Sequence, residues 1–500
     1  MPKLPRIVLV PLAALCVLGL SLTGGPAQAA PVGALPAKAT TDPALTSRIA
    51  ATLKDSRVTK ASVGVVVADS VSGSEYYAKS AGTALTPASN MKLVTAAAAL
   101  DLLGAQRRFA TGVYAGAAPV SGTVSRLYLR GYGDPTLREA DLRSLAAQVK
   151  AAGVTRVTGS VVGDAGYFDD DRYHNNWDPT DYNYSYAPQV SALTLSPSSE
   201  LKVGTVLVTY KPGSSAGARA RLGVIPASAG GFVKVVNRTT TTRAGTGASI
   251  SVRRQVHTNT ITVSGRVALK RALVKRVVTI SNPARYAAHV FTRVLRWAGV
   301  AVAGSPITGR TPATRVKLGS DSSATVGQIV PKLMKASNNG IAEQLIKTLG
   351  RVDGKAGTWA AGSARVLGWL KGTQTLPSTV RIVDGSGLAH RNKLTARVLV
   401  RLLQYVRGRP WFGTFYDSLP VAGNSDPAIG GTLEFRMVGT AAQNNLRAKT
   451  GTLNGVTALS GYVTGRDGRP YTFSMLGSYR GSSPLVVFDR LGARLAAWSG

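Results

Sequence analysis

The stretch Ser89-Asn90-Met91-Lys92 decides the fold of this chain, and its flanking residues show why. Pro87 comes two residues before Ser89, and an Ala/Leu-rich run, residues 93–100, follows Lys92. A proline near the start and an alanine-rich run after it are typical of a helix N-terminus. Ser89 is therefore predicted to lie in the first helical turn, where unpaired N–H groups and the helix dipole favour negative charge.

Lys92 follows Ser89 by three residues, so both side chains are predicted to lie on one helix face. A serine hydroxyl is a weak nucleophile until a neighbouring group takes its proton. A lysine can take that proton only if its pKa falls toward neutrality, through burial or a second nearby cation. The two residues are therefore predicted to act as nucleophile and base, with Lys449 as the second cation.

Two further short motifs follow along the chain. Ser337-Asn338-Asn339 lies between two segments of helical character, residues 326–334 and 341–347, and is predicted to face a cleft from the loop between them. Lys449-Thr450-Gly451 lies in an alternating segment, residues 445–453, which suits a β-strand. Together with Ser89 and Lys92, these motifs predict one active site.

The Ser337-Asn338-Asn339 loop suits acyl transfer at a serine. The Ser337 hydroxyl can relay a proton between Lys92, Lys449 and a leaving amine. The Asn339 amide can hydrogen-bond the backbone of a peptide substrate. Both residues are therefore predicted to be catalytic.

The strand motif suits substrate binding. Lys449 and Thr450 can hold a terminal carboxylate by charge and hydrogen bond. Gly451 has no side chain, so a substrate backbone can approach it closely. The N–H groups of Ser89 and Thr452 can form an oxyanion hole.

Each motif alone has an ordinary structural explanation. Ser-x-x-Lys at a helix start is commonly a cap followed by a solvated lysine, Ser-x-Asn between helices is commonly a turn, and Lys-Thr-Gly often ends a strand. Their joint occurrence favours the catalytic interpretation, because three independent coincidences would also have to fall in the right order.

The three motifs are the element set of penicillin-binding proteins and serine β-lactamases. The chain resembles the low-molecular-mass, class C penicillin-binding proteins of the D-alanyl-D-alanine carboxypeptidase/endopeptidase type, peptidase family S13. Further blocks similar to that family are residues 133–137, 184–193, 384–388, 447–456 and 458–463. The family usually has aspartate in the middle of Ser-x-Asn, where this chain has Asn338.

The resemblance implies an α/β (α+β) fold whose β-lactamase/transpeptidase-like catalytic domain has an antiparallel sheet flanked by helices. It implies a serine-type D-Ala-D-Ala carboxypeptidase/DD-endopeptidase without metal or cofactor, which acts on peptidoglycan stem peptides through an acyl-enzyme on Ser89. β-Lactam antibiotics are then expected to acylate Ser89, because their strained amide mimics the same bond. The alternatives are a β-lactamase or esterase on the same scaffold and a non-catalytic cell-wall-binding protein.

The separation between Ser89 and Ser337 is much longer than a compact transpeptidase domain needs. The resemblance suggests that residues 110–321 are an insertion of two small accessory domains between catalytic segments 44–109 and 322–500. Residues 201–280 are rich in Val, Thr, Gly and Arg with local alternation, which predicts short antiparallel strands. The insertion is expected to be a structural or wall-binding module.

The N-terminus has the pattern of a secretory signal peptide. A basic start precedes a mostly apolar run, residues 7–22, and Ala27-Gln28-Ala29 is a small-residue cleavage site. We predict a signal peptide over residues 1–29, a flexible leader over residues 30–43, and a secreted, cell-wall-associated protein. An uncleaved anchor is the alternative, although the apolar run is short for a membrane span.

The only cysteine, Cys16, lies within the predicted signal peptide. Leu15 precedes it where a lipoprotein signal usually has a small residue, so lipidation is not predicted. The mature chain would then contain no disulfide and no catalytic thiolate.

The formal net charge is +36, which favours polyanionic partners. For a secreted protein the expected polyanions are anionic cell-wall polymers. Nucleic acid is the alternative, but no nucleic-acid-binding motif is present and basic pairs such as Arg253-Arg254 and Lys275-Arg276 are scattered along the chain. Each such pair taken alone is interpreted as a solvated surface.

Other patterns carry weaker signals. No two of His174, His257, His289 and His390 have metal-ligand spacing, and no G-x-S-x-G nucleophile elbow is present. Tyr182, Tyr184 and Tyr186 are interpreted as a strand face packed on a neighbouring domain, with a sugar-binding strip as the alternative. Residues 169–171, three successive aspartates, are interpreted as a loop, with a calcium site as the alternative.

Overall fold

A computed structural model describes residues 42–500. The predicted signal peptide, residues 1–29, lies outside the described residues, and so does the predicted leader up to residue 41. That leader was predicted to extend to residue 43, but helix α1 (Pro43–Thr52) begins there, because Asp42 caps its first turn and Pro43 suits the first helical position. Within residues 42–500, no helix is long and apolar enough to cross a membrane.

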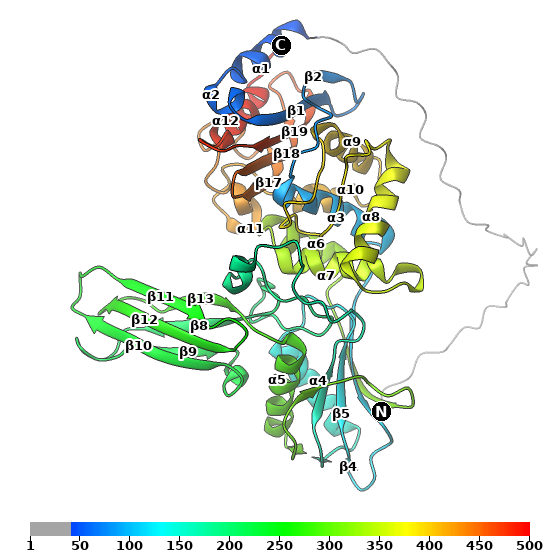
Figure 1. Cartoon of the computed structure of the whole chain (residues 1–500), viewed down its shortest axis with the longest axis vertical. Coiled ribbons are helices and arrows are strands. Elements are labelled where there is room, and N and C mark those ends of the chain that lie inside the picture. Colours follow the sequence, from blue (N-terminus) through cyan, green and yellow to red (C-terminus); the bar gives the residue numbers. More distant parts are fainter. Residues whose placement is uncertain (1–41) are drawn as a thin grey trace, which may run out of the picture. The chain divides into compact units, whose positions relative to one another are not determined.

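A five-stranded antiparallel sheet forms the centre of the part that carries the three motifs. Its order is β17-β18-β19-β1-β2, so strands from the two ends of the described chain pair side by side (Figure 1). The strands are β1 (Ser62–Asp69), β2 (Glu75–Lys79), β17 (Arg447–Leu453), β18 (Val456–Thr464) and β19 (Pro470–Ser478).

Helices cover both faces of this sheet, because its strands place apolar side chains on both sides. In β1, Val65 and Val67 join the core that contains residues of α1 and of α12 (Leu485–Ala496). Val66 alternates with them and packs with Ala396 and Val400 of α9. The remaining helices of this part are α2 (Ser56–Thr59), α3 (Met91–Leu102), α6 (Val326–Lys335), α7 (Asn339–Gly350), α8 (Trp359–Thr373), α9 (Ala396–Arg407), α10 (Phe412–Ser418) and α11 (Pro427–Gly430). The predicted antiparallel sheet flanked by helices is confirmed.

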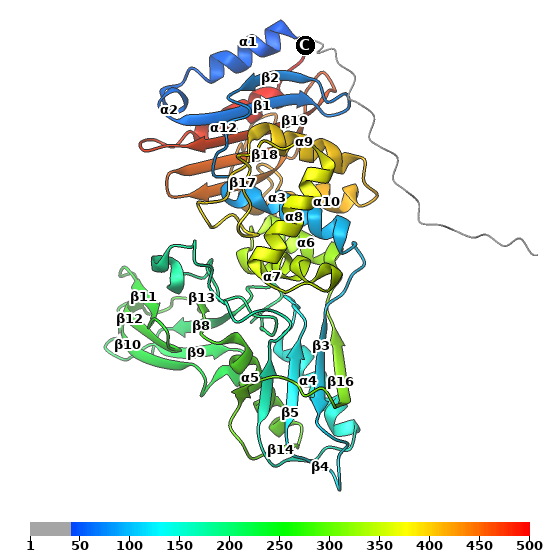
Figure 2. The same ribbon diagram turned by 45° about the vertical axis from the view of Figure 1, so that its right-hand side comes forward.

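A second five-stranded sheet lies between α3 and α6 in sequence. Its order is β15-β7-β5-β3-β16, and the strands that leave and re-enter the first part, β3 and β16, pair antiparallel (Figure 2). Its strands are β3 (Ala110–Ala115), β5 (Leu127–Gly131), β7 (Val161–Asp164), β15 (Ile307–Thr308) and β16 (Val316–Ser322), and its helices are α4 (Glu139–Ala151) and α5 (Pro283–Trp297). A short sheet joins β4 (Thr123–Val124), β6 (Arg156–Val157) and β14 (Ala301–Val302). The boundaries at residues 110 and 321 stay a prediction.

Two three-stranded sheets form a separate lobe, residues 205–279. One sheet has the order β10-β12-β11 and the other β13-β8-β9. The strands are β8 (Thr205–Lys211), β9 (Arg221–Ile225), β10 (Lys234–Thr242), β11 (Ser249–Arg254), β12 (Thr260–Ala268) and β13 (Val274–Thr279). The predicted strands are present, but the expectation of purely antiparallel pairing is wrong, because β10 pairs with β12 in parallel.

We predict that Gly461→Ala destabilises the protein by about 1–3 kcal/mol, the usual cost of overpacking. Gly461 pairs with Ala448 in the central sheet, and a Cβ at this position would overlap the Arg447 carbonyl oxygen and lie 2.6 Å from the Cα of Ala448. Gly368→Ala is the matched control, because a Cβ there meets nothing within 4 Å and Ala favours the helix. Thermal unfolding should show a lower midpoint for the first variant only; equal midpoints would contradict the tight pairing of β17 with β18.

Candidate active site

Residues of the first two motifs, and Thr452 directly after the third, line one cavity of about 600 Å³, whereas Lys449, Thr450 and Gly451 do not line it. Ser89, Ser337, Asn339 and Thr452 all line it. Ser89 lies in a short 3-10 turn, Ala88–Asn90, that runs directly into α3, as the sequence predicted. Ala88 has φ 46°, an uncommon left-handed conformation for a residue with a Cβ, so the turn that presents Ser89 is strained.

Lys92 is fully buried beside Ser89 and is held from three directions. Its Nζ lies 3.0 Å from Ser89 Oγ and donates at 2.6 Å to Asn339 Oδ1 and at 2.8 Å to the Ser386 carbonyl oxygen. The three partners lie in segments far apart in the sequence, so the position of the amine depends on the folded chain. This geometry suits an amine that exchanges a proton with the serine hydroxyl.

Burial lowers the pKa of the Lys92 amine from 10.5 to about 7, and the negative charges of Glu343 and Asp384 oppose this shift. The sequence predicted that Lys449 would be a second cause. The structure gives the main effect to burial, whereas on Lys449 burial and then the charge of Lys92 hold the pKa well below its usual range.

The charges of two buried carboxyl groups act on Lys92: Asp384 begins the family-like block 384–388, and Glu343 lies outside every motif quoted from the sequence. Glu343 accepts hydrogen bonds from the backbone N–H groups of Gly385 and Ser386, and Asp384 accepts from those of Gly387 and Ala389. Burial, and then the charge of Asp384, raise the pKa of Glu343 to about 7. Both carboxyls fix the loop whose Ser386 carbonyl contacts Lys92.

Ser337 and Asn339 differ in how closely they match their predicted roles. Ser337 lines the cavity with φ 50°, but among the described residues no hydrogen bond to its hydroxyl is formed. Asn339 contacts the base itself, because Oδ1 accepts from Lys92 while Nδ2 donates at 2.7 Å to the Tyr186 carbonyl oxygen. Its amide therefore positions Lys92 in addition to facing the space where a peptide would bind.

Asn338, the middle residue of that motif, is structural here. Its side chain accepts from the N–H of Ile341, which caps α7, and its Nδ2 donates at 2.7 Å to the Leu201 carbonyl oxygen. An aspartate at this position could form the cap but not the second bond. The asparagine therefore ties the Ser337 loop to the inserted segment.

The predicted strand residues lie at the edge of the central sheet. Lys449 is fully buried, with Nζ donating to the Thr450 carbonyl oxygen at 3.0 Å, and Thr450 Oγ1 lies 2.8 Å from Thr432 Oγ1. Thr452 is exposed and lines the cavity. Its strand, β17, is at the edge of the sheet and pairs only with β18, so half of its backbone N–H groups point away from β18. Gly451 has a packing role that the sequence did not indicate, because a Cβ there would lie 2.7 Å from the Pro87 carbonyl oxygen, so its lack of a side chain lets β17 pack against the Ser89 turn. Its predicted contact with substrate stays a prediction.

The inserted chain supplies one wall of the cavity. Tyr184 and Tyr186 are exposed and their rings stack with an interplanar angle of 7°. Both line the cavity together with Asp178 and Asp181. The interpretation of these tyrosines as a packed strand face is therefore wrong for Tyr184 and Tyr186; no local pattern showed that this loop reaches Ser89.

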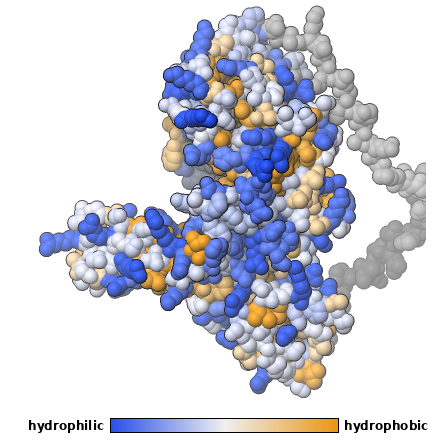
Figure 3. Space-filling model, in the orientation of Figure 1, coloured by the Kyte–Doolittle hydropathy of each residue, from blue (hydrophilic) through white to orange (hydrophobic). Residues whose placement is uncertain are grey.

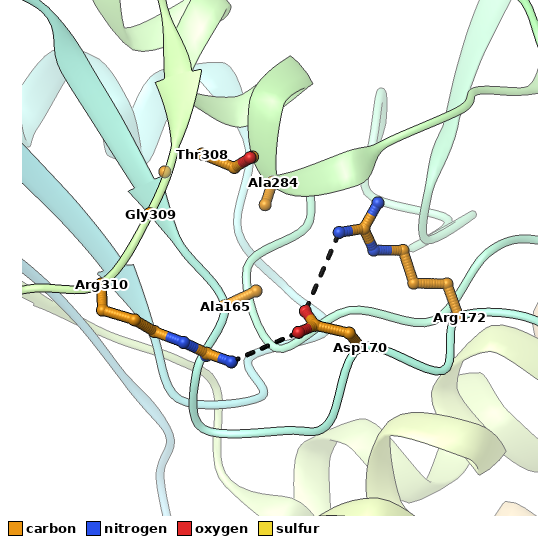
Figure 4. Close-up of a pocket in the computed structure, with 8 residues that line it drawn as sticks. Ala165, Asp170, Arg172, Ala284, Thr308, Gly309 and Arg310 are labelled. Atoms are coloured by element: carbon orange, nitrogen blue, oxygen red, sulfur yellow. Dashed lines mark hydrogen bonds and ion pairs between the residues drawn. The ribbon is translucent and has the colours of Figure 1, made fainter.

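The aspartate run 169–171 forms ion pairs within the protein. Asp169 pairs with the buried Lys347, and Asp170 lies 3.5 Å from Arg310 and 3.9 Å from Arg172 beside a smaller cavity (Figure 4). Within residues 42–500 no group of three or more acidic, histidine or cysteine side chains could hold a metal ion. The ion pairs of Asp169 and Asp170 agree with the loop interpretation.

Comparison with known proteins shows which family has this sequence and fold. Residues 45–487 match the model of the D-Ala-D-Ala carboxypeptidase 3 (S13) family. The chain belongs to this family. It is therefore a peptidase, one of the hydrolases.

Individual relatives cover most of the chain. A D-alanyl-D-alanine carboxypeptidase of an Actinomadura species is 42% identical over 458 residues, which cover 90% of this chain and 84% of the relative. A carboxypeptidase of Mycobacterium tuberculosis is 27% identical over 448 residues, covering 86% and 79%. The crystal structure of penicillin-binding protein 4 from Haemophilus influenzae has a similar fold, with a TM-score of 0.73 at 22% identity over 88% of this chain and 97% of that one.

We predict that Asn338→Asp lowers the stability by about 1–3 kcal/mol, because it sets a buried carboxylate against the Leu201 carbonyl oxygen. The contact and burial raise the pKa of the new carboxyl above its unfolded value, so the loss is full above the folded pKa and shrinks as pH falls toward the unfolded one. Thermal unfolding should show a larger deficit at pH 8 than at pH 5. A pH-independent deficit would contradict this explanation.

Proposed function

We propose that this protein is a serine-type D-Ala-D-Ala carboxypeptidase that acts on peptidoglycan stem peptides through an acyl-enzyme. One observation carries the proposal: the buried Lys92 amine, with a pKa of about 7, lies 3.0 Å from Ser89 Oγ. An amine with that pKa is about half unprotonated near neutral pH, and the neutral form can accept the serine proton. Membership of the S13 family supports the same reaction.

The first half-reaction forms an ester on Ser89. Ser89 Oγ attacks the carbonyl carbon between the two terminal D-alanines while its proton passes to Lys92. The oxyanion takes hydrogen bonds from the N–H groups of Ser89 and Thr452. The C–N bond then breaks, the proton reaches the amine of the leaving D-alanine with help from Ser337, and the acyl group stays on the serine oxygen.

The second half-reaction restores the enzyme. Water attacks the ester carbonyl, gives up a proton to Lys92, and releases the shortened peptide from Ser89 as the hydroxyl is re-formed. Lys449, Thr450 and the strand β17 hold the substrate before cleavage, with the terminal carboxylate near Thr450. Burial and the charge of Lys92 hold the pKa of Lys449 well below its usual range, and a substrate carboxylate beside the amine would favour its protonated form.

Three further properties belong to the same proposal. β-Lactams acylate Ser89, because their amide is attacked in the same way. A cross-linked peptide in the same cavity gives DD-endopeptidase cleavage, because its cross-link presents the same kind of amide to Ser89. The protein acts outside the cytoplasm, at the cell wall, as the signal-peptide pattern of residues 1–29 suggests.

Two alternatives remain distinct from this proposal. A β-lactamase or esterase on the same scaffold would hydrolyse the acyl-enzyme with penicillin quickly, and a non-catalytic wall-binding protein would form none. The intact contacts of Lys92 with Ser89 and Asn339 favour a working catalyst over the second alternative.

The test combines intact-protein mass spectrometry after benzylpenicillin with assays of D-alanine release from a pentapeptide and of cleavage of a cross-linked dimer. The wild type and the control Ser56→Ala should carry one penicilloyl adduct and cleave both substrates. Ser89→Ala should carry none and lose about 10⁴-fold or more in peptide turnover.

The other outcomes separate the alternatives. Rapid loss of penicillin without a stable adduct would move the assignment to a β-lactamase. Intact penicillin, no adduct and no D-alanine release from the wild type would overturn the catalytic proposal.

A further inference from the structure

The cations of this chain are unevenly distributed relative to its acids. Residues 201–320 contain 20 of the 60 lysines and arginines and none of the 24 aspartates and glutamates. No nearby carboxylate within this segment can neutralise its cations. The segment therefore carries a strong positive field, and it includes the whole lobe of residues 205–279.

The β10-β12-β11 sheet places several of these cations on one open face. Side chains alternate between the two faces of a strand. In β12, Ile261 and Val263 are buried in the lobe core, so Thr262, Ser264 and Arg266 point outward. The strand pairing then places Arg238 beside Ser264 and Arg253 beside Thr262 on the same face.

We name this surface the cationic face; it consists of Lys234, Val236, Arg238, Thr240, Ser249, Ser251, Arg253, Thr260, Thr262, Ser264 and Arg266. Its four cations are exposed, and none of them forms an ion pair with another described residue. Apart from Val236, its other members carry hydroxyl groups. Figure 3 shows the hydrophilic side chains that project from this lobe, which Figure 1 labels β8 to β13.

Arginine, lysine and hydroxyl groups are the side chains that hold phosphate oxygens by charge and hydrogen bond. Same-face residues along a strand lie about 7 Å apart and neighbouring strands about 4.8 Å. Cations spread over such a grid suit a long, repeating anion better than a single small ion. We propose that the cationic face binds a phosphodiester polymer of the cell wall and so holds the enzyme beside its substrate.

Two other polyanions fit the face less well. Single-stranded nucleic acid is held by aromatic side chains that stack on bases, and the only Phe, Tyr or Trp residues of the lobe are the buried Tyr210 and the half-buried Phe232. A membrane surface is usually bound with apolar side chains that enter the lipid, and Val236, half-buried, is the only apolar member of the face.

The cationic face belongs to a folded lobe that contacts the rest of the inserted chain. Arg254 faces inward from β11 and is buried, donating to the Tyr182 and Thr258 carbonyl oxygens. Tyr182 belongs to the same inserted loop as Tyr186, which lines the catalytic cavity. The cationic face is thus joined through protein contacts to the wall of the active site, while its residues touch none of the catalytic groups.

The test compares two variants of the full mature enzyme that lose the same charge. The face variant carries Lys234→Gln, Arg238→Gln, Arg253→Gln and Arg266→Gln. The control carries Lys54→Gln, Lys371→Gln, Arg401→Gln and Arg466→Gln, which are exposed cations outside the lobe. Binding to fluorescently labelled poly(glycerol phosphate) is measured across salt concentrations, with single-stranded DNA and phosphatidylglycerol vesicles as competing probes, and circular dichroism checks folding.

We expect the face variant to bind the polymer on the order of tenfold or more weakly than the control, since each cation near an anionic surface contributes about fivefold. The slope of log K against log salt should decrease by about three to four in the face variant. Penicillin acylation of Ser89 should be unchanged in both variants. A failure to bind the polymer can therefore be distinguished from a failure of the catalytic proposal. Equal losses in the two variants, no polymer binding by the wild type, or tighter binding of DNA or vesicles would overturn the proposal.

Discussion

The removal of the Lys92 amine from water is the interaction on which the rest of the site depends. A shift in pKa from 10.5 to about 7 corresponds to on the order of 5 kcal/mol between the charged and neutral forms. Because burial disfavours the charged amine, Lys92 can act as a base. The buried amine is stabilised by three oxygen atoms that lie within hydrogen-bond distance of its Nζ. Burial and placement therefore act together: the same contacts that exclude water also aim the amine at Ser89.

The buried carboxyl groups of Glu343 and Asp384 limit how far the pKa of Lys92 falls. Glu343 and Asp384 counter part of the lowering of the Lys92 pKa, and they hold the backbone of residues 384–389 through N–H donors. A buried carboxylate without such donors would be far more costly. The inserted chain contributes as well, because the carbonyl oxygens of Tyr186 and Leu201 accept hydrogen bonds from Asn339 and Asn338. The catalytic geometry is thus shared by both parts of the chain.

Local features of the site could be predicted from the sequence, whereas its long-range contacts could not. The helix after Ser89, the loop at Ser337 and the strand at Lys449 follow from capping, proline and alternation, which act between near neighbours. Glu343 follows Asn339 by four residues on α7, but its contact with the loop at Ser386, like the approach of Asp384 and Tyr186 to the site, joins segments that are far apart in the sequence. The blocks 184–193 and 384–388 marked the last two segments without showing where they would lie. The parallel pairing of β10 with β12 and the packing role of Gly451 were missed for the same reason, because both depend on which segment lies alongside.

Nuclear magnetic resonance of the mature enzyme labelled with ¹³Cε-lysine tests the central claim most directly, with Lys92→Ala to assign the resonance. We expect the Lys92 signal to titrate with a midpoint near pH 7. A midpoint near 10.4, the ordinary lysine value, would mean that Lys92 is charged at neutral pH and would contradict its role as the base for Ser89.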